Sequence, residues 1–475
     1  MSTGPAAEER AAASSTPRWL APAVLLLGLV VRVPLILAWP AVFGGDSVVR
    51  LARSNELFLG YWLPLPQALV MLCRGLHPDP LWTRLAFALI GSLAAAALAR
   101  AVGAASGPVA GAAAGAFLAL HPMWAYYSLV PYQEGPTALF LLLGAEALVR
   151  RRPGRAALWL GLACGCRYEA WIAAFLAALA HWRSPRRALS FLVAPALWIA
   201  LHLGLGPAGS YVLDLDPAAA RLHRVAYLFT KLREYSGLPF LALAAAGLVV
   251  AALRRDRRWG WGALFVGAVV IVTVLAGHEF PPGSGQVSER MDHLPAAAAC
   301  AAAGLALGAL VGAVRGRARP AAAALAVLVI AGVGWKWNAQ LRAQVRTAND
   351  DPALRLAWQV ATLARGQLGR GEHLAVAGLP IPDDAVEAYV RKVAAGHGQV
   401  ERALAIARAW SGHSPDLDRV AANLARPAGT AVRAGTAEAA LLAVFDDAPQ
   451  PPPCGTVLAR YTSGARGVTV CRPPR

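Results

Sequence analysis

Ionisable side chains that could carry chemistry lie in four short polar segments of an otherwise apolar chain. A carboxylate can act as a general base on a hydroxyl group, and the planar guanidinium of arginine can bind two phosphate oxygens at once. Charged groups are costly in apolar surroundings, so their presence there indicates a function. The residues concerned are Asp46, Glu134, Arg167, Tyr168, Glu169, His278 and Arg290.

Asp46 is the most informative of these residues. It follows Gly44 and Gly45, and glycines let the backbone approach a ligand closely. It also precedes residues 47–53, whose sequence is typical of a helix, so its side chain could instead cap that helix. Glu134, at the start of a later apolar stretch, has the same structural alternative. The two roles are compatible, and both stay open at this point.

The basic residues have structural alternatives as well. Arg167 could pair with Glu169 and serve packing alone. Arg290 could extend its charged end to a membrane interface, and His278 could be an ordinary interfacial histidine. Acids and arginines that come from four separate segments nevertheless favour one shared site.

The composition is that of a protein embedded in a membrane. Hydrophobic residues make up 57% of the chain and charged residues 15%, which lies well outside the range of soluble globular proteins. The net charge of +18 comes from arginines clustered between apolar stretches, as the positive-inside rule predicts for a multi-span protein. The location of these arginines does not favour nucleic-acid binding, and the chain has no basic groove interleaved with aromatic residues of the kind that binds single-stranded nucleic acid. The arginine clusters lie at 150–155, 183–187, 254–258 and 315–319.

The apolar stretches are long enough to predict membrane-spanning helices, each of which needs about 20 apolar residues. The stretch 156–182 is ambiguous, and we interpret it as two short helices that meet at residues 166–169. All four arginine clusters then face the cytoplasm, and about eleven passes place the N-terminus inside and the C-terminus outside. A helix break at membrane depth must line a cavity inside the protein. The other spans are predicted at 19–40, 83–102, 107–127, 136–149, 188–206, 238–253, 259–277, 294–314 and 320–336.

The chain changes character near residue 338. Residues 1–18 are predicted to be a disordered cytoplasmic tail, 19–337 the multi-span domain, and 338–475 a small soluble α/β domain outside the membrane. The predicted outside loops are 41–82, 128–135, 207–237 and 278–293. The C-terminal strands are expected at 374–379, 440–445, 457–461 and 468–471, and helices at 383–395 and 400–410.

The six cysteines show no zinc-type spacing. Cys454 and Cys471 flank two of the predicted strands, so they could form a disulfide in an oxidising compartment or remain two unpaired thiols.

The chain resembles the membrane-embedded GT-C glycosyltransferases, and especially their branch of protein O-mannosyltransferases and aminoarabinose transferases. The resemblance covers roughly residues 19–310 and rests on the order of several short motifs. These are an acid after the first span, a Pro-rich stretch, a proline followed by serine and glutamate, a Gly-rich helix ending in Arg-Tyr-Glu, and a late Glu-Arg-Met before Leu-Pro. They correspond to Gly45-Asp46, Trp62 to Pro66, Pro122 to Ser128 with Glu134, Gly161 to Glu169, Glu289 to Met291, and Leu294-Pro295.

The resemblance implies transfer of a sugar from a polyprenyl-phosphate donor to an extracytoplasmic protein, lipid or glycan acceptor, with inversion at the anomeric carbon. Asp46 would then be the general base, and Arg290 and Arg167 would bind the donor phosphate. Positioning of the substrates would fall to Glu134, Tyr168, Glu169 and His278. Family members often carry two acids together in the first loop, whereas Asp46 is followed by Ser47. A divalent metal cofactor therefore stays an open question.

Two other functions fit part of the same pattern. A transporter or lipid flippase would also place charges in a membrane cavity, but it is expected to show helix breaks at matching positions of two halves. Only one such break is evident in the sequence. An assembly protein that binds a partner through its outer domain is the third alternative.

Overall fold

The computed structural model describes most of the helical region and parts of the C-terminal region. It covers 17–40, 63–77, 79–205, 221–254, 259–276, 292–349, 374–377, 441–446, 453–463 and 466–473, with residues 47, 50, 51, 54, 57, 359, 360, 363 and 367. The chain divides into two compact units. The first contains 1–35, 58–66 and 85–343, and the second contains 36–57, 67–84 and 344–475.

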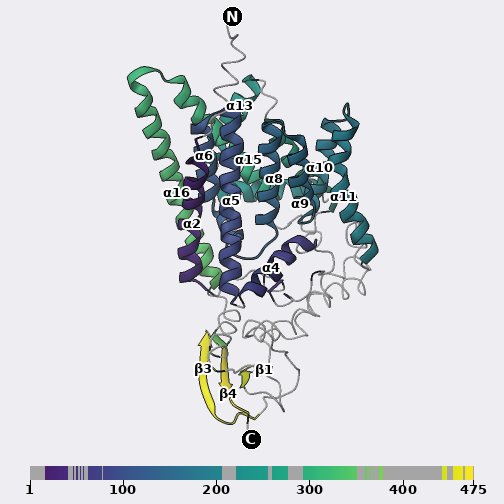
Figure 1. Cartoon of the computed structure of the whole chain (residues 1–475). Coiled ribbons are helices and arrows are strands. Elements are labelled where there is room, and N and C mark those ends of the chain that lie inside the picture. The colour runs from purple at the N-terminus through teal and green to yellow at the C-terminus, as the bar shows by residue number, and fades with distance from the viewer. Residues whose placement is uncertain are drawn as a thin grey trace, which may run out of the picture. The chain divides into compact units, whose positions relative to one another are not determined.

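The first unit is a helical bundle (Figure 1). Prolines at the first helical position begin six of the helices, because a proline there loses no hydrogen bond and already has a helical φ. The helices are α2 (Leu20–Ala38), α4 (Pro64–Leu76), α5 (Pro80–Ser106), α6 (Pro108–Leu120), α7 (Pro122–Tyr127), α8 (Glu134–Val149), α9 (Pro153–Cys164), α10 (Tyr168–Ala180), α11 (Pro185–Leu205), α12 (Arg221–Ser236), α13 (Leu238–Arg254), α14 (Gly260–Ala276), α15 (His293–Ala313) and α16 (Arg319–Asn349). Most of α4, the start of α5 and the last residues of α2 and α16 belong to the second unit.

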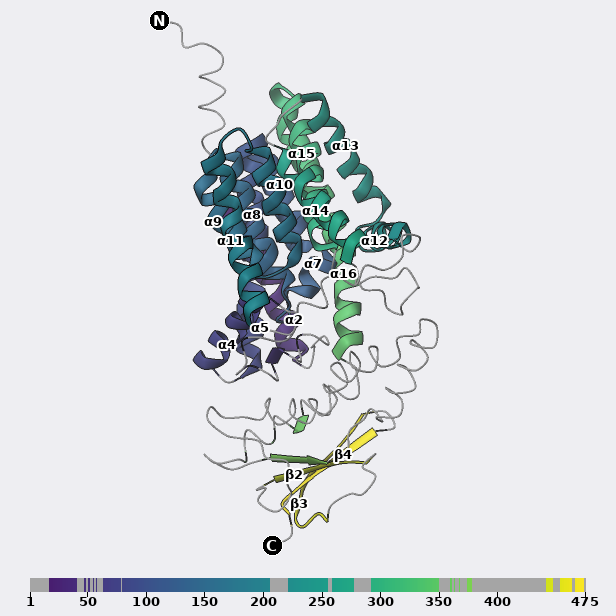
Figure 2. The same cartoon turned by 90° about the vertical axis from the view of Figure 1, so that its right-hand side faces the viewer.

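Each predicted span coincides with a helix, but two spans differ in detail. The span predicted at 107–127 is broken at Pro122 into α6 and α7. The last one is longer than predicted, because α16 continues through residue 337 to Asn349. The division of 156–182 into two helices is confirmed, since α9 ends at Cys164 and α10 begins at Tyr168. The helices α8, α9, α10 and α11 lie side by side (Figures 1 and 2).

Small residues let three helices of the bundle approach each other closely. A Cβ atom at Gly304 of α15 would lie 2.6 Å from the carbonyl oxygen of Ala110 on α6. One at Gly247 of α13 would lie 1.8 Å from the carbonyl oxygen of Ala302 on α15. Helix association in lipid depends on such close packing, because burial of apolar surface gains little where the solvent is itself apolar. The Ala- and Gly-rich composition of these helices therefore specifies the contact between them.

Four helical stretches in the described part of the chain are long and apolar enough to cross a membrane, namely Leu20–Ala38, Pro80–Ser106, His293–Ala313 and Gly316–Asn349. A fifth results if α12 and α13 count as one span, although they meet at an angle of 110°. The bend lies at Gly237, whose φ of +82° is unfavourable for a residue with a side chain. Several remaining helices are apolar but shorter. The count of eleven passes stays a prediction.

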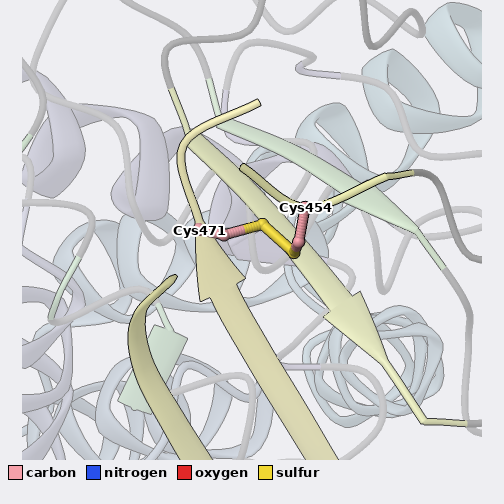
Figure 3. The surroundings of a disulfide bond; sticks show 2 residues. All are labelled: Cys454 and Cys471. Carbon is pink, nitrogen blue, oxygen red and sulfur yellow. A yellow bond between two sulfur atoms is a disulfide. The ribbon is translucent and has the colours of Figure 1, made fainter. Parts of the chain in front are cut away.

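The second unit contains a four-stranded sheet in the order β1-β2-β4-β3. Its strands are β1 (Leu374–Ala377), β2 (Leu441–Phe445), β3 (Val457–Ser463) and β4 (Arg466–Cys471), and all four lie at predicted positions. β1 pairs with β2 in parallel, and the other pairs are antiparallel. Cys454 and Cys471 form a disulfide with a Cα–Cα distance of 5.8 Å (Figure 3). The helices predicted at 383–395 and 400–410 lie outside the described residues, so the α/β class of this region stays a prediction.

The orientation of the bundle can be tested by labelling introduced cysteines. Single cysteines near Arg152, Arg186, Arg257 and Arg317 are expected to be shielded from an impermeant thiol reagent added outside, because the arginine clusters should face the cytoplasm. A cysteine near Gly396 should react. Labelling near Arg186 without labelling near Arg152 would show that α9 and α10 do not return the chain to the same side.

Candidate functional site

The break between α9 and α10 positions the central residue of the site. Arg167 has an extended backbone, with φ −151° and ψ 153°, and is the N-cap residue of α10. The carbonyl oxygen of Gly165 accepts a hydrogen bond of 3.0 Å from the backbone N–H of Leu65. A Cβ atom at Gly165 would lie 2.5 Å from the ring of Trp198. The indole N–H of Trp171, on α10, donates to the carbonyl oxygen of Cys164, the last residue of α9, at 2.7 Å. This hydrogen bond links the two helices across the break.

Arg167 forms ion pairs with two buried carboxylates. Its Nε donates to both carboxylate oxygens of Glu169, at 2.9 and 3.0 Å, and its Nη1 donates to Oε1 of Glu134. The side chain of Arg167 is 10% exposed, that of Glu169 is 2% exposed, and that of Glu134 is fully buried. Charges buried this deeply are stable only when they are paired and hydrogen-bonded.

Both carboxylates lie in the first turn of a helix. Glu134 is the first residue of α8, and Glu169 is the second residue of α10. The unsatisfied N–H groups and the dipole of a helix N-terminus favour negative charge. Gln133, not Glu134, is the N-cap residue of α8, and Oε1 of Glu134 accepts a hydrogen bond from Arg167. The pair of Arg167 and Glu169 that the sequence suggested is present. Arg167 also contacts a second carboxylate, that of Glu134, which lies 33 residues away in the chain.

His293, the first residue of α15, belongs to the same cluster. It is 1% exposed and lies close enough to Glu169 for an electrostatic interaction with that carboxylate. Asp292, the preceding residue, is also buried. Tyr168 is half-buried and contacts Trp171 edge to face, with 5.1 Å between the ring centres. The cluster therefore joins α8, the break between α9 and α10, and the start of α15.

Chemically, this cluster is a polar, predominantly acidic site inside an apolar bundle. Two carboxylates share one guanidinium, so the three groups together carry a net negative charge when the acids are ionised. Carboxylates held in this way are suited to accept hydrogen bonds from the hydroxyl groups of a ligand. Among the described residues, no group of three or more His, Cys, Asp or Glu side chains has the arrangement of a metal site.

Three residues of the predicted site lie outside the described part of the chain. They are Asp46, His278 and Arg290. Their roles therefore stay predictions, whereas Glu134, Arg167, Tyr168 and Glu169 are placed together by the structure.

A buried arginine that we did not predict lies elsewhere in the bundle. Arg32 is fully buried in α2, and its Nε donates to Oγ of Ser128 at 2.6 Å. Its Nη1 donates to the carbonyl oxygens of Ala119, at 2.9 Å, and Gly28, at 3.1 Å. The contacts with Ala119 and Ser128 hold α2 against the end of α6 and the residue that follows α7. A single arginine within the otherwise apolar residues 20–38 was the sequence signal for it.

No family model matches this chain, and no curated protein matches it. Solved structures do. ArnT from Cupriavidus metallidurans bound to undecaprenyl phosphate has a TM-score of 0.50 at 15% identity, and the match covers 94% of this chain and 97% of that one. The apo structure of the same protein has a TM-score of 0.52 at 14% identity, with coverages of 95% and 98%. ArnT is an aminoarabinose transferase of the GT-C superfamily. The chain therefore shares its fold with ArnT over nearly its whole length, in agreement with the resemblance drawn from its sequence motifs.

Proposed function

We propose that the chain is an integral membrane glycosyltransferase that moves a sugar from a polyprenyl-phosphate donor to an acceptor outside the cytoplasm. The observation that carries the proposal is the convergence of Glu134, Arg167, Glu169 and His293 in the interior of a bundle with the fold of ArnT. Ionisable groups in the interior of a membrane protein mark a substrate site by default. The ArnT structure that holds undecaprenyl phosphate supports a lipid phosphate as the carrier.

Asp46 acts as the general base in this proposal. Attack of an acceptor hydroxyl on the anomeric carbon requires removal of the hydroxyl proton, and a carboxylate can accept it. The polyprenyl phosphate departs without being protonated, so the reaction needs no general acid. A single displacement inverts the configuration at the anomeric carbon.

Arg290 and Arg167 have different roles in this proposal. Arg167 is already shared between two carboxylates, so its first role is to hold Glu134 and Glu169 in position. We therefore assign the larger part of phosphate binding to Arg290, whose planar fork can bind phosphate oxygens in a bidentate way. Glu134, Glu169, Tyr168 and His278 orient the hydroxyl groups of the sugar or the acceptor.

The location follows from the same reasoning. We place the chain in the cell inner or plasma membrane, with its N-terminus in the cytoplasm and its C-terminal region outside. Its partners are then the lipid-linked donor, membrane lipids and a protein, lipid or glycan acceptor.

The proposal is tested by product analysis. Mass spectrometry of the cell envelope before and after deletion of the gene should reveal a glycan that loses one sugar residue. The purified chain should release polyprenyl phosphate from a polyprenyl-phosphate sugar only when an extract containing that acceptor is added. Unchanged glycans together with transport of the lipid across vesicles would instead support a flippase.

Arg290→Lys should impair transfer although it conserves the charge, and Arg290→Ala should impair it more. An ammonium group cannot reproduce the bidentate contact of a guanidinium. Kinetics should show weaker use of the lipid-linked donor and an unchanged apparent affinity for the acceptor. Arg233→Lys, on the exposed side of α12, is the matched control and should behave like the unmodified chain. Normal donor kinetics in Arg290→Lys would reduce Arg290 to an interfacial anchor.

A further inference from the structure

A basic cavity lies at the other end of the helices that carry the candidate site. It is a half-open cavity of about 400 Å³. Residues at the C-terminal ends of α8 and α10, residues that follow them, and residues of α9, α11 and α14 line it. Glu134 and Glu169 lie at the N-termini of α8 and α10, whereas the cavity lies at their C-termini. At 1.5 Å per residue, the length of α10 separates the two regions by about 20 Å. The cavity is therefore distinct from the Arg167 site.

The backbone at the end of α8 has a conformation that favours glycine, yet an arginine occupies it. Arg151 has a φ of +56° and is the one non-glycine residue with positive φ among those described. The N–H of Arg151 donates to the carbonyl oxygen of Leu148, and that of Arg152 donates to the carbonyl oxygen of Ala147. These bonds form a Schellman cap, whose left-handed position is usually glycine. A side chain kept at a strained position points to a function for that side chain.

The lining of the cavity combines positive charge with an apolar wall. Its basic members come from two separate arginine clusters and from the end of α10, and its described lining includes no acidic side chain. The basic residues are Arg151, Arg152, His181 and Arg187; the apolar ones include Val149 and Trp261. Trp261 is 4% exposed and packs against Phe265, with 5.6 Å between the ring centres.

We propose that this cavity binds the phosphate headgroup of an anionic phospholipid. The arginines would bind the phosphate oxygens, and the wall around Val149 and Trp261 would contact the beginning of the acyl chains. Basic pockets between membrane helices bind phospholipid headgroups in this way, and tryptophan is enriched at the depth of the headgroups. The proposal concerns a lipid that is not consumed, and it does not depend on the proposed transfer reaction.

Two observations favour a lipid over a free phosphate ion. The cavity lies at the ends of apolar helices, where headgroups are concentrated, and about half of its lining is apolar side chains that a free ion would not need. If the arginines served only to orient the chain in the membrane, that role would explain the positive charge of the cluster. It would not explain an arginine at residue 151, because a glycine there would relieve the strain and leave Arg150 and Arg152 to orient the chain.

The test compares lipid binding by the purified full chain and three variants, measured by native mass spectrometry. Phosphatidylglycerol and phosphatidylcholine with identical acyl chains are the probes, and inorganic phosphate is added in a separate arm. The unmodified chain should retain phosphatidylglycerol in preference to phosphatidylcholine. Arg151→Gly and Arg187→Gln should each weaken phosphatidylglycerol binding about five-fold. Arg155→Gln removes a charge of the same cluster from outside the cavity lining and should leave binding unchanged.

The same variants separate binding from stability. Arg151→Gly should unfold at the same temperature as the unmodified chain or a higher one, because glycine is favoured at a positive φ. Loss of the lipid without loss of stability supports a binding role for Arg151. Equal binding by all variants, or equal retention of the two lipids, would overturn the proposal. Displacement of phosphatidylglycerol by inorganic phosphate at millimolar concentration would assign the cavity to a free anion instead.

Discussion

Asp46→Asn is expected to reduce sugar transfer by about 10²–10⁴-fold while membrane insertion and thermal stability stay nearly unchanged. Asparagine has the shape of aspartate and caps a helix equally well, but it cannot accept the proton of the acceptor hydroxyl. The measurement is the initial rate of polyprenyl phosphate release in detergent or nanodiscs. Thermal unfolding of the same sample shows whether the fold is intact.

Asp79→Asn provides the matched control for this experiment. Its Oδ1 accepts a hydrogen bond of 2.9 Å from the backbone N–H of Leu81 at the start of α5, so its role is that of a helix cap. The amide oxygen of asparagine preserves that bond, and transfer should continue at the normal rate. If Asp46→Asn kept more than about a tenth of the activity, which corresponds to less than ~1.4 kcal/mol in the barrier, Asp46 would not be the general base.

Arg167→Gln is expected to have the largest effect on stability. It leaves the buried carboxylates of Glu134 and Glu169 without the cation that they share. Removing one partner of a buried ion pair costs about 3–5 kcal/mol, so the variant should unfold well below the temperature of the unmodified chain. Transfer should be lost as well, because the two carboxylates are no longer held in place. The measurement is the unfolding temperature in detergent, and tryptophan fluorescence is the signal that detects unfolding.

A second ion-pair network in the same bundle gives the control. Arg100 donates to Oε1 of Glu146 at 2.8 Å, but it is 49% exposed, and Arg150 contacts the same carboxylate at 2.9 Å. Arg100→Gln should therefore cost less than about 1 kcal/mol. Adding Glu169→Gln to Arg167→Gln should recover part of the lost stability, because one uncompensated charge is removed. Equal unfolding temperatures for Arg167→Gln and Arg100→Gln would show that the cluster is not held by its charges.

The sequence by itself determined most of the helices and the four strands, because the signals for them are local. It missed α12, which lies within the predicted loop 207–237, and the break between α6 and α7. A proline is the first residue of α4, α5, α6, α7, α9 and α11, where its fixed φ suits the start of a helix. The arginine clusters on either side of residues 156–182 predicted the break between α9 and α10, since two short helices meeting at the polar residues 166–169 keep both clusters on the same side. The four strands followed from short apolar runs in a polar region. The resemblance to GT-C proteins likewise rested on the order of short motifs.

The sequence predicted one shared site, but only the tertiary structure decided which charged side chains far apart in the chain contact each other. Arg167 and Glu134 are 33 residues apart, and Arg32 and Ser128 are 96 residues apart. The spacing of neighbouring residues carries no information on such contacts, because they depend on how whole helices pack. The same holds for His293 beside Glu169 and for the cavity between α8, α10, α11 and α14. The positive φ of Arg151 was equally hidden, since an arginine at that position opposes the preference of its own backbone and only surrounding contacts can hold it there.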